Sequence, residues 1–211
     1  MRILFIGNSH TYLNGLPFQL RAMVNHVLGQ GRCFAWMCAT GGQTLLGHSG
    51  ELAEVAAIRF HPWDHIVLQE ATHPFRGYDA LREGFDALEP HLRFSGAELL
   101  FYQTWSRRQR PHHQAELDVA FNRLAIKKSL RVIPVADAWH RAMKLHPQLD
   151  LYDEDGSHAS PAGTYLAACV FFAALTGLTT AELPARIETG GATLADLDPG
   201  WAAALQQVAF A

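Results

Sequence analysis

The segment from Arg2 to Leu28 reads RILFIGNSHTYLNGLPFQLRAMVNHVL, and its two halves carry the patterns that decide the fold. Its beginning, residues 2–7, is short and almost entirely apolar, which predicts a buried strand. From Leu16 onward, apolar side chains recur at the spacing of one helix face. They are Leu16, Leu20, Met23, Val24 and Val27. A buried strand followed by an amphipathic helix is the repeating unit of α/β proteins.

The same strand-then-helix pattern recurs along most of the chain. Short apolar runs predict further strands at residues 33–38, 65–68, 99–103 and 131–135. Helical spacing marks residues 78–92, 117–125 and about 162–175, and the last of these helices would be capped by Ser160 and started by Pro161. This alternation predicts an α/β fold, a three-layer α/β/α sandwich with a flavodoxin-like, five-stranded parallel sheet.

Length and composition indicate one domain over residues 1–211. The chain has 211 residues, of which 49% are hydrophobic and 18% charged, and no stretch has the composition of a linker. A formal net charge of −3 argues against nucleic acid as a partner. A dense basic cluster, Arg107, Arg108 and Arg110, fits either a solvated loop or an anion site, and we favour the solvated loop.

The cysteines and the amino terminus give information on the cellular compartment. The chain has an odd number of cysteines, Cys33, Cys38 and Cys169, and no CxxC motif. Both facts argue against a disulfide framework and a structural zinc site. The apolar run at the start is far too short for a signal-peptide core or a membrane span. We therefore expect a cytoplasmic location and no membrane partner.

The topology predicts where functional residues lie. In a parallel sheet, ligands bind outside the carboxyl ends of the strands. We therefore expect functional residues at about 7–11, 39–48, 69–73 and 103–108, and each window contains glycine or polar residues.

Ser9 lies in the first window, within Gly7-Asn8-Ser9-His10-Thr11. At a strand-to-helix turn, a serine hydroxyl is presented at the edge of the sheet, and its backbone N–H can help to stabilise an oxyanion. The same serine could instead cap the following helix. The segment does not match the G-x-S-x-G elbow of α/β-hydrolases, because Thr11 replaces the second glycine.

Asp155-Gly156-Ser157-His158 precedes the last predicted helix. An aspartate three residues before a histidine on a tight loop can hold one imidazole nitrogen while the other faces a serine. His158 would take the proton of Ser9, and Asp155 would stabilise the imidazolium that forms. An exposed turn with a helix-capping aspartate is the alternative.

The chain order Ser9, Asp155, His158 resembles the SGNH/GDSL hydrolase superfamily, in which Gly-x-Ser ends the first strand and Asp-x-x-His forms the last block. Further matches, to a branch with a Gly-Asn-Ser first block, are Trp63-Asp64, Leu68-Gln69-Glu70, Thr104-Trp105, Ala138-Trp139 and Asp155 to Ser160. The resemblance extends from Arg2 to about Gly177. It implies Ser9 as nucleophile, His158 and Asp155 as its partners, and no cofactor.

The resemblance also implies an oxyanion hole. Gly42, after the second strand, would donate its N–H, although a plain Gly41-Gly42 turn is the alternative. The family's third block supplies an Asn donor, whereas this chain has Gln69, whose longer side chain offers an equivalent amide. If Gln69 is instead structural, only the N–H groups of Ser9 and Gly42 remain, and one lost donor typically costs about 100- to 1,000-fold in rate.

Several side chains near these blocks are candidates for the substrate pocket. They are Asn8, His10, His73, and Trp105 with Arg107, where Trp105 either forms a pocket wall or packs beneath the loop. The chain has 12 histidines, but neither an HExxH motif nor a phosphate-binding loop is present, so we expect no metal and no nucleotide cofactor.

These inferences point to a serine esterase whose partner is a small-molecule acyl ester, with O-acetyl groups on carbohydrate as one candidate. A non-catalytic or weakly catalytic carbohydrate-binding domain and an acyltransferase on the same scaffold are the alternatives. The apolar residues of segment 183–211 are expected to pack on the body of their own chain.

Overall fold

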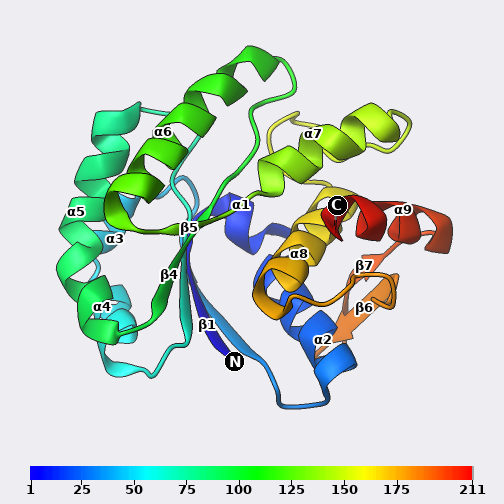
Figure 1. Ribbon diagram of the computed structural model, residues 1–211, viewed down its shortest axis with the longest axis horizontal. Helices are drawn as coiled ribbons and strands as arrows, with labels where there is room; N and C mark the ends of the chain where they lie inside the picture. Colours follow the sequence, from blue (N-terminus) through cyan, green and yellow to red (C-terminus); the bar gives the residue numbers. More distant parts are fainter. Residues whose placement is uncertain (211) are drawn as a thin grey trace.

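A five-stranded parallel sheet between two layers of helices forms the centre of the computed structural model, which describes residues 1–210 (Figure 1). The strands are β1 (Arg2–Gly7), β2 (Phe34–Ala39), β3 (His65–Leu68), β4 (Glu98–Tyr102) and β5 (Arg131–Ile133). All four pairings are parallel, and the order is β2-β1-β3-β4-β5. This is the order of flavodoxin-like sheets, so the predicted three-layer α/β/α fold is confirmed.

Successive residues of β1 face opposite layers of the sandwich. Ile3 and Phe5 belong to the core on one face of the sheet, and Leu4 and Ile6 belong to the core on the other. The first face is covered by α2 (Leu16–Leu28), α7 (Val135–Leu145) and α8 (Pro161–Thr176), and α9 (Pro199–Phe210) packs on α8 on the same side. The second face is covered by α3 (Leu45–Ser49), α4 (Leu52–Phe60), α5 (Tyr78–Ser95) and α6 (Gln114–Lys128). Figure 1 shows these two groups on opposite sides of the sheet.

Helix α8 begins as predicted, with Ser160 as its N-cap and Pro161 as its first residue. Pro161 occupies its first turn, and Ser160 Oγ accepts a hydrogen bond from the N–H of Gly163 at 3.1 Å. Residues 163–172 of this helix are all buried, because α8 lies between the sheet and the carboxyl-terminal elements.

Helices α3, α4 and α7 were not predicted, and α7 changes the end of the fifth strand. The predicted strand extended to Val135, whereas β5 ends at Ile133 and Val135 begins α7. Pro134 lies between them. It has no N–H to donate to the strand ladder, and its φ of −85° suits a helix start, so the strand cannot continue through it.

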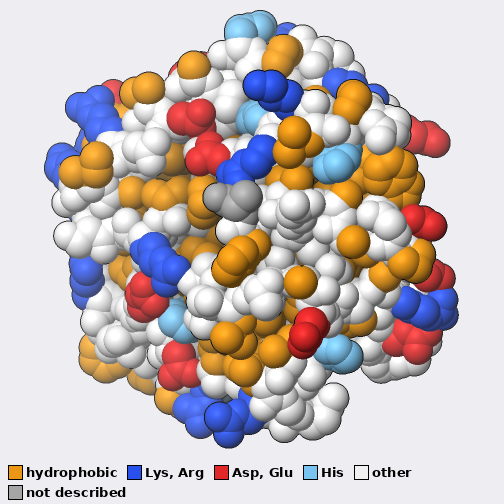
Figure 2. Space-filling model, turned by 45° about the vertical axis from the view of Figure 1, so that its right-hand side comes forward, with side chains coloured by type: hydrophobic (Ala, Val, Ile, Leu, Met, Phe, Trp, Pro, Cys, Tyr) orange, Lys and Arg blue, Asp and Glu red, His pale blue; other side chains and the backbone are white. Residues whose placement is uncertain are grey.

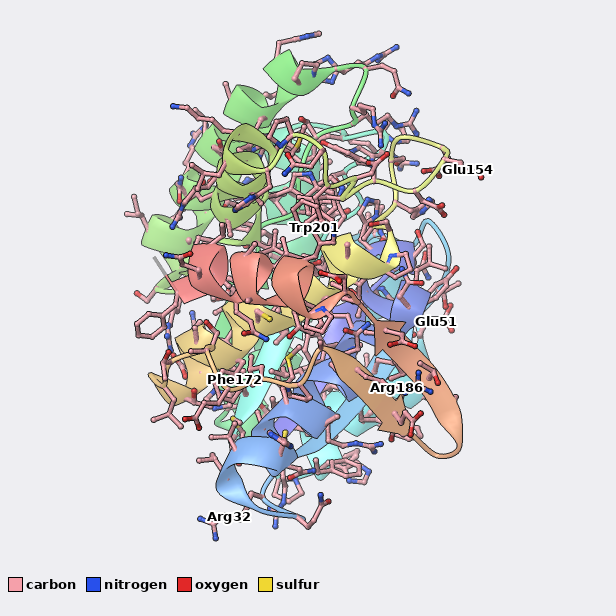
Figure 3. The ribbon with its side chains drawn as sticks, turned by 90° about the vertical axis from the view of Figure 1, so that its right-hand side faces the viewer. Arg32, Glu51, Glu154, Phe172, Arg186 and Trp201 are labelled. Carbon is pink, nitrogen blue, oxygen red and sulfur yellow. The ribbon has the colours of Figure 1, made fainter. Side chains whose placement is uncertain are left out.

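The carboxyl-terminal segment packs on its own chain, as expected. It forms an antiparallel hairpin, β6 (Arg186–Thr189) and β7 (Ala192–Asp196), followed by α9, and neither element was predicted. Leu205 and Val208 of α9 are buried in the core formed with α8. Figure 3 shows α9, which carries Trp201, on the same side of the molecule as the hairpin, which carries Arg186. Ala211 lies outside the described residues.

The surface carries charge of both signs. Figure 2 shows acidic and basic side chains interspersed among apolar ones on one face, which agrees with the small net charge of the chain. No helix within residues 1–210 combines the length and the apolar composition that crossing a membrane requires.

Candidate active site

Ser9 lies at the carboxyl end of strand β1, which is paired on both sides in the sheet, at the point where the chain enters the short helix α1 (Ser9–Tyr12). This helix is capped by Asn8, whose side-chain oxygen accepts a hydrogen bond from the N–H of His10 at 3.1 Å. Because Asn8 supplies the cap, the hydroxyl of Ser9 is free of that role. Ser9 Oγ instead lies 2.8 Å from Nε2 of His158.

His158 is held on its other side by Asp155. Its Nδ1 lies 2.5 Å from Asp155 Oδ2, and Asp155 Oδ1 accepts hydrogen bonds from the N–H groups of Ser157 and His158 at 2.8 and 2.9 Å. Burial raises the pKa of Asp155, but these backbone hydrogen bonds and the bond to the imidazole outweigh it and lower the pKa to about 2. Asp155 is therefore ionised at neutral pH. Ser9, His158 and Asp155 form one hydrogen-bonded row.

The loop that carries Asp155 and His158 is fixed by backbone contacts. Tyr152 and Ala159 form an antiparallel bridge, and the N–H of Asp153 donates to the carbonyl of His158 at 2.8 Å. Gly156 has a φ of +64°, a left-handed backbone conformation that residues with a Cβ rarely adopt. The tight turn between Asp155 and His158 therefore requires glycine.

The row opens into a cleft of about 230 Å³, called the Ser9 cleft below. Its lining consists of Asn8, Ser9, His10, Gly42, Ala71, Thr72, His73, Arg107, Asp155, Ser157 and His158. All four windows in which functional residues were expected contribute to it. Ala71, Thr72 and Ser157 have no predicted role, although their positions after β3 and inside the Asp-x-x-His block are the signals that could have identified them.

Solved structures share this architecture. A DUF4886 family protein from Bacteroides uniformis superposes with a TM-score of 0.76 at 21% sequence identity, over 100% of this chain and 93% of that chain. The acetyl xylan esterase AlAXEase gives 0.68 at 14% identity, over 83% and 100% of the two chains. A member of the lipolytic protein G-D-S-L family from Veillonella parvula gives 0.61 at 14% identity, over 83% and 97%.

The fold is that of the GDSL-type hydrolases. The sequence matches no family model and no curated protein, so the likeness to GDSL-type hydrolases is a likeness of fold.

The GDSL-type fold brings Gly42 to the same cleft as Ser9. Gly42 has a φ of +69°, and no atom lies within 4 Å of where a Cβ would stand. Glycine is therefore needed here for the backbone conformation. Asn8 Nδ2 donates to the carbonyl of Gln43 at 3.1 Å and so ties the Gly42 loop to the Ser9 turn.

The prediction that Gln69 contacts the oxyanion or the substrate is wrong. Gln69 is 1% exposed, and its Oε1 accepts hydrogen bonds from the N–H of Asn8 at 2.8 Å and from the hydroxyl of Thr11 at 3.0 Å. Its Nε2 donates to the backbone carbonyl of Glu70 at 2.5 Å. Because both ends of the amide are occupied inside the protein, Gln69 clamps the Ser9 turn to the end of β3.

Trp105 is also structural, which corrects its assignment to the substrate pocket. Its ring is fully buried and stacks on Trp139, with the ring centroids 3.7 Å apart. Its indole N–H donates to the carbonyl of Ser157 at 2.9 Å. Trp105 therefore packs beneath the Asp155 loop, which is the second of the two alternatives that the sequence left open.

Two further histidines lie beside His158. The ring of His10 lies 4.9 Å from that of His73 and 5.1 Å from that of His158. Burial, with smaller effects of His73 and His158, lowers the pKa of His10 to about 3. Burial, followed by Arg107 and His158, lowers the pKa of His73 to about 4. Both imidazoles are therefore neutral at neutral pH and line the Ser9 cleft without adding charge.

The low pKa of His10 predicts that acid destabilises the fold. Between pH 6.5 and about 3, the unfolded chain binds a proton at His10 that the folded chain does not bind, so this stability is complete above pH 6.5 and falls with pH. At pH 4 we expect the loss from His10 to be about 3 kcal/mol relative to pH 7. Urea unfolding should therefore show a smaller loss between pH 7 and pH 4 in His10→Gln than in the wild type.

His112→Gln is the control for this measurement, because His112 is exposed and lies outside the Ser9 cleft. It should keep the wild-type dependence on pH. Equal losses in the wild type and both variants would contradict the role of His10 in acid sensitivity.

The described residues show neither an activated cysteine nor a metal site. Cys33, Cys38 and Cys169 are unpaired thiols, and burial raises the pKa of Cys33 and of Cys38 to about 11, which disfavours their thiolates. Within residues 1–210, no group of three or more His, Cys, Asp or Glu side chains has the geometry of a metal site.

Proposed function

We propose that this protein is a serine esterase that hydrolyses small acyl esters. The observation that carries the proposal is the hydrogen-bonded row of Ser9, His158 and Asp155, which opens into a cleft at the carboxyl edge of the sheet. A nucleophile, a base and a group that orients the base are the parts that acyl transfer requires. The fold shared with an acetyl xylan esterase and a lipolytic G-D-S-L protein supports the same reaction class.

In the proposed reaction, Ser9 Oγ attacks the acyl carbon while His158 Nε2 takes the hydroxyl proton. Asp155 stabilises the imidazolium. The ester C–O bond then breaks, and His158 gives the proton to the departing alcohol. A water molecule attacks the acyl-enzyme with His158 again as base, which releases the carboxylic acid and restores the Ser9 hydroxyl.

The oxyanion would be held by the backbone N–H groups of Ser9 and Gly42. Gln69 is directed into the interior, so this chain lacks the side-chain donor of the family's third block. A missing donor costs about 100- to 1,000-fold in rate, and we therefore propose a slow enzyme. The same feature is what favours the alternative of a carbohydrate-binding domain that retains the cleft.

For the acyl group we propose acetyl, with O-acetylated carbohydrate as the substrate class. Two observations support this choice. The Ser9 cleft, at about 230 Å³, suits a short acyl group better than a long chain. One structure with the same fold is an acetyl xylan esterase.

The direct test is labelling with a fluorophosphonate, which reacts only with an activated serine. The wild-type protein should be labelled at Ser9, as located by mass mapping of the modified peptide, and His158→Ala should not be labelled. His112→Ala, in which an exposed histidine is removed, should be labelled like the wild type. No labelling of the folded wild type would overturn the esterase and favour the carbohydrate-binding alternative.

A further inference from the structure

A second cavity, of about 240 Å³, adjoins the Ser9 cleft and is called the Arg110 cavity below. Thr72, His73 and Arg107 line both, so a molecule whose ester group lies at Ser9 can extend from one into the other. The other walls come from the loops that follow β3 and β4 and from the first turn of α6.

Two arginines without ionic partners line the Arg110 cavity. Among residues 1–210, no carboxylate lies within 4.0 Å of the guanidinium of Arg107 or of Arg110. Arg108, between them, is instead paired with Asp150. Glu116 is the one carboxylate in the described lining, so the two arginines leave the cavity with an excess of positive charge.

A solvated loop is the predicted environment of this basic cluster, and in the structure its three arginines differ. Arg108 fits that interpretation, because its guanidinium is paired at the surface and lies over the ring of Tyr152. Arg107 and Arg110 are exposed as well, but both also line the cavity beside the candidate nucleophile.

Buried polar groups in the same lining also lack partners. Ser106 is 1% exposed, and its N–H and carbonyl are bonded to Gln114 and Tyr152, yet its hydroxyl has no hydrogen-bond partner in the described chain. Nε2 of His73 is likewise buried without a partner among these residues. Buried polar groups in folded proteins are normally hydrogen-bonded. Within residues 1–210, the hydrogen-bonding capacity of the Ser106 hydroxyl and of His73 Nε2 is therefore unused, and both residues line the Arg110 cavity.

We infer that the Arg110 cavity binds a carboxylate of the substrate, with Arg107 and Arg110 as its ionic partners and Ser106 as a hydroxyl donor. Guanidinium groups match the planar geometry of a carboxylate, and hydrogen bonds between the two are strong. Phe75 and Leu117 supply an apolar wall for the carbon atoms that join the carboxylate to the ester. The identity of that ester rests on the proposed function, whereas carboxylate binding does not.

The carboxylate has two chemical sources. It belongs to the alcohol in an O-acetylated sugar acid, which agrees with the proposed acetyl group. In a half-ester of a dicarboxylic acid it belongs to the acyl group, which would then replace acetyl. Both place a negative charge beyond the scissile ester, which is the feature that the Arg110 cavity would recognise.

Binding is tested by titrating the intact protein with succinate and following the heat released. We expect the wild-type protein to bind succinate. In Arg110→Gln the dissociation constant should be about tenfold larger, because a hydrogen bond to a charged group is lost. Arg108→Gln removes the same charge from the neighbouring position outside the cavity lining and should bind succinate like the wild type. Absence of wild-type binding, or equal weakening in both variants, would overturn the inference.

Two matched pairs of esters then identify the source of the charge. The first pair is 4-nitrophenyl butyrate and 4-nitrophenyl hydrogen succinate, and the second is phenyl acetate and 4-acetoxybenzoate. In one of the two pairs, kcat/KM should be about tenfold higher for the charged ester than for the uncharged one. Arg110→Gln should abolish this preference, and Arg108→Gln should retain it. A preference in the first pair assigns the carboxylate to the acyl group, and one in the second assigns it to the alcohol.

The two experiments separate this inference from the esterase itself. Equal kcat/KM values within both pairs would overturn the carboxylate subsite while the esterase stands. Succinate binding that depends on Arg110, without hydrolysis of any of the four esters, would overturn the esterase and leave the anion site.

Discussion

Replacement of Ser9 by alanine is expected to lower kcat for ester hydrolysis by about 10⁴-fold or more. Ser9 Oγ is the atom that bonds to the acyl carbon, and it lies 2.8 Å from the base that would deprotonate it. The hydroxyl of Ser157 also lies beside a histidine, 2.8 Å from Nδ1 of His73, but Nε2 of His73 has no hydrogen-bond partner among residues 1–210 and so no carboxylate to stabilise its imidazolium. The helix cap comes from Asn8, so the variant should keep the wild-type melting temperature. Turnover of 4-nitrophenyl acetate and thermal unfolding measure the two effects.

Ser95→Ala is the matched control for Ser9→Ala. Ser95 precedes β4, at the amino edge of the sheet, and its hydroxyl donates only to the carbonyl of Leu92 at 2.6 Å. This variant should turn over the ester like the wild type. A folded Ser9→Ala protein as active as Ser95→Ala would show that Ser9 is not the nucleophile.

Asp155→Asn is expected to lower kcat by about 10⁴-fold with little change in the fold. Asp155 Oδ1 already accepts two backbone hydrogen bonds, from Ser157 and His158. In the variant the amide oxygen keeps those two bonds, which turns the NH₂ group toward Nδ1 of His158. His158 must then accept at Nδ1 and carry its proton on Nε2, so it cannot take the proton of Ser9.

Asp153→Asn removes a carboxylate from the same loop and serves as the control. Asp153 Oδ1 accepts only the N–H of Glu154, at 2.9 Å, and does not line the Ser9 cleft. We expect Asp153→Asn to keep the wild-type kcat and its rate of fluorophosphonate labelling. If Asp155→Asn behaves in the same way, the tautomer of His158 is not set by Asp155 and the proposed role of this carboxylate is wrong.

The elements that the sequence predicted are those whose burial pattern is strong and local. The strands are short apolar runs, and the helices from Leu16 and from Tyr78 each show one continuous apolar face. Elements with weaker signals were missed. Helices α3 and α4 are short, and the β6–β7 hairpin is partly exposed. Helix α7 was missed because Pro134, at its start, interrupts an apolar run that continues to Val135.

The direction of individual side chains at the sheet edge was not predictable. Gln69 and Trp105 both follow strands, yet both point into the interior, because partners distant in the sequence hold them there. The N–H of Asn8 that Gln69 accepts lies 61 residues away, and the carbonyl that Trp105 contacts lies 52 residues away. Local spacing contains no information about such contacts.

By itself, the sequence determined the parallel α/β sheet and the placement of Ser9 at its carboxyl edge, because strand burial and the turns that follow strands are local properties. Asp155 and His158 lie between α7 and α8 and follow no strand, so the resemblance of the first and last blocks to SGNH/GDSL hydrolases was what paired them with Ser9. Tertiary structure alone decided which polar residues at that edge reach the Ser9 cleft. It also separated Arg107 and Arg110, which line a cavity, from Arg108, which pairs with Asp150. The physical reason is that a side chain's partner depends on which distant segments the fold brings beside it, whereas its place on an element depends on its near neighbours.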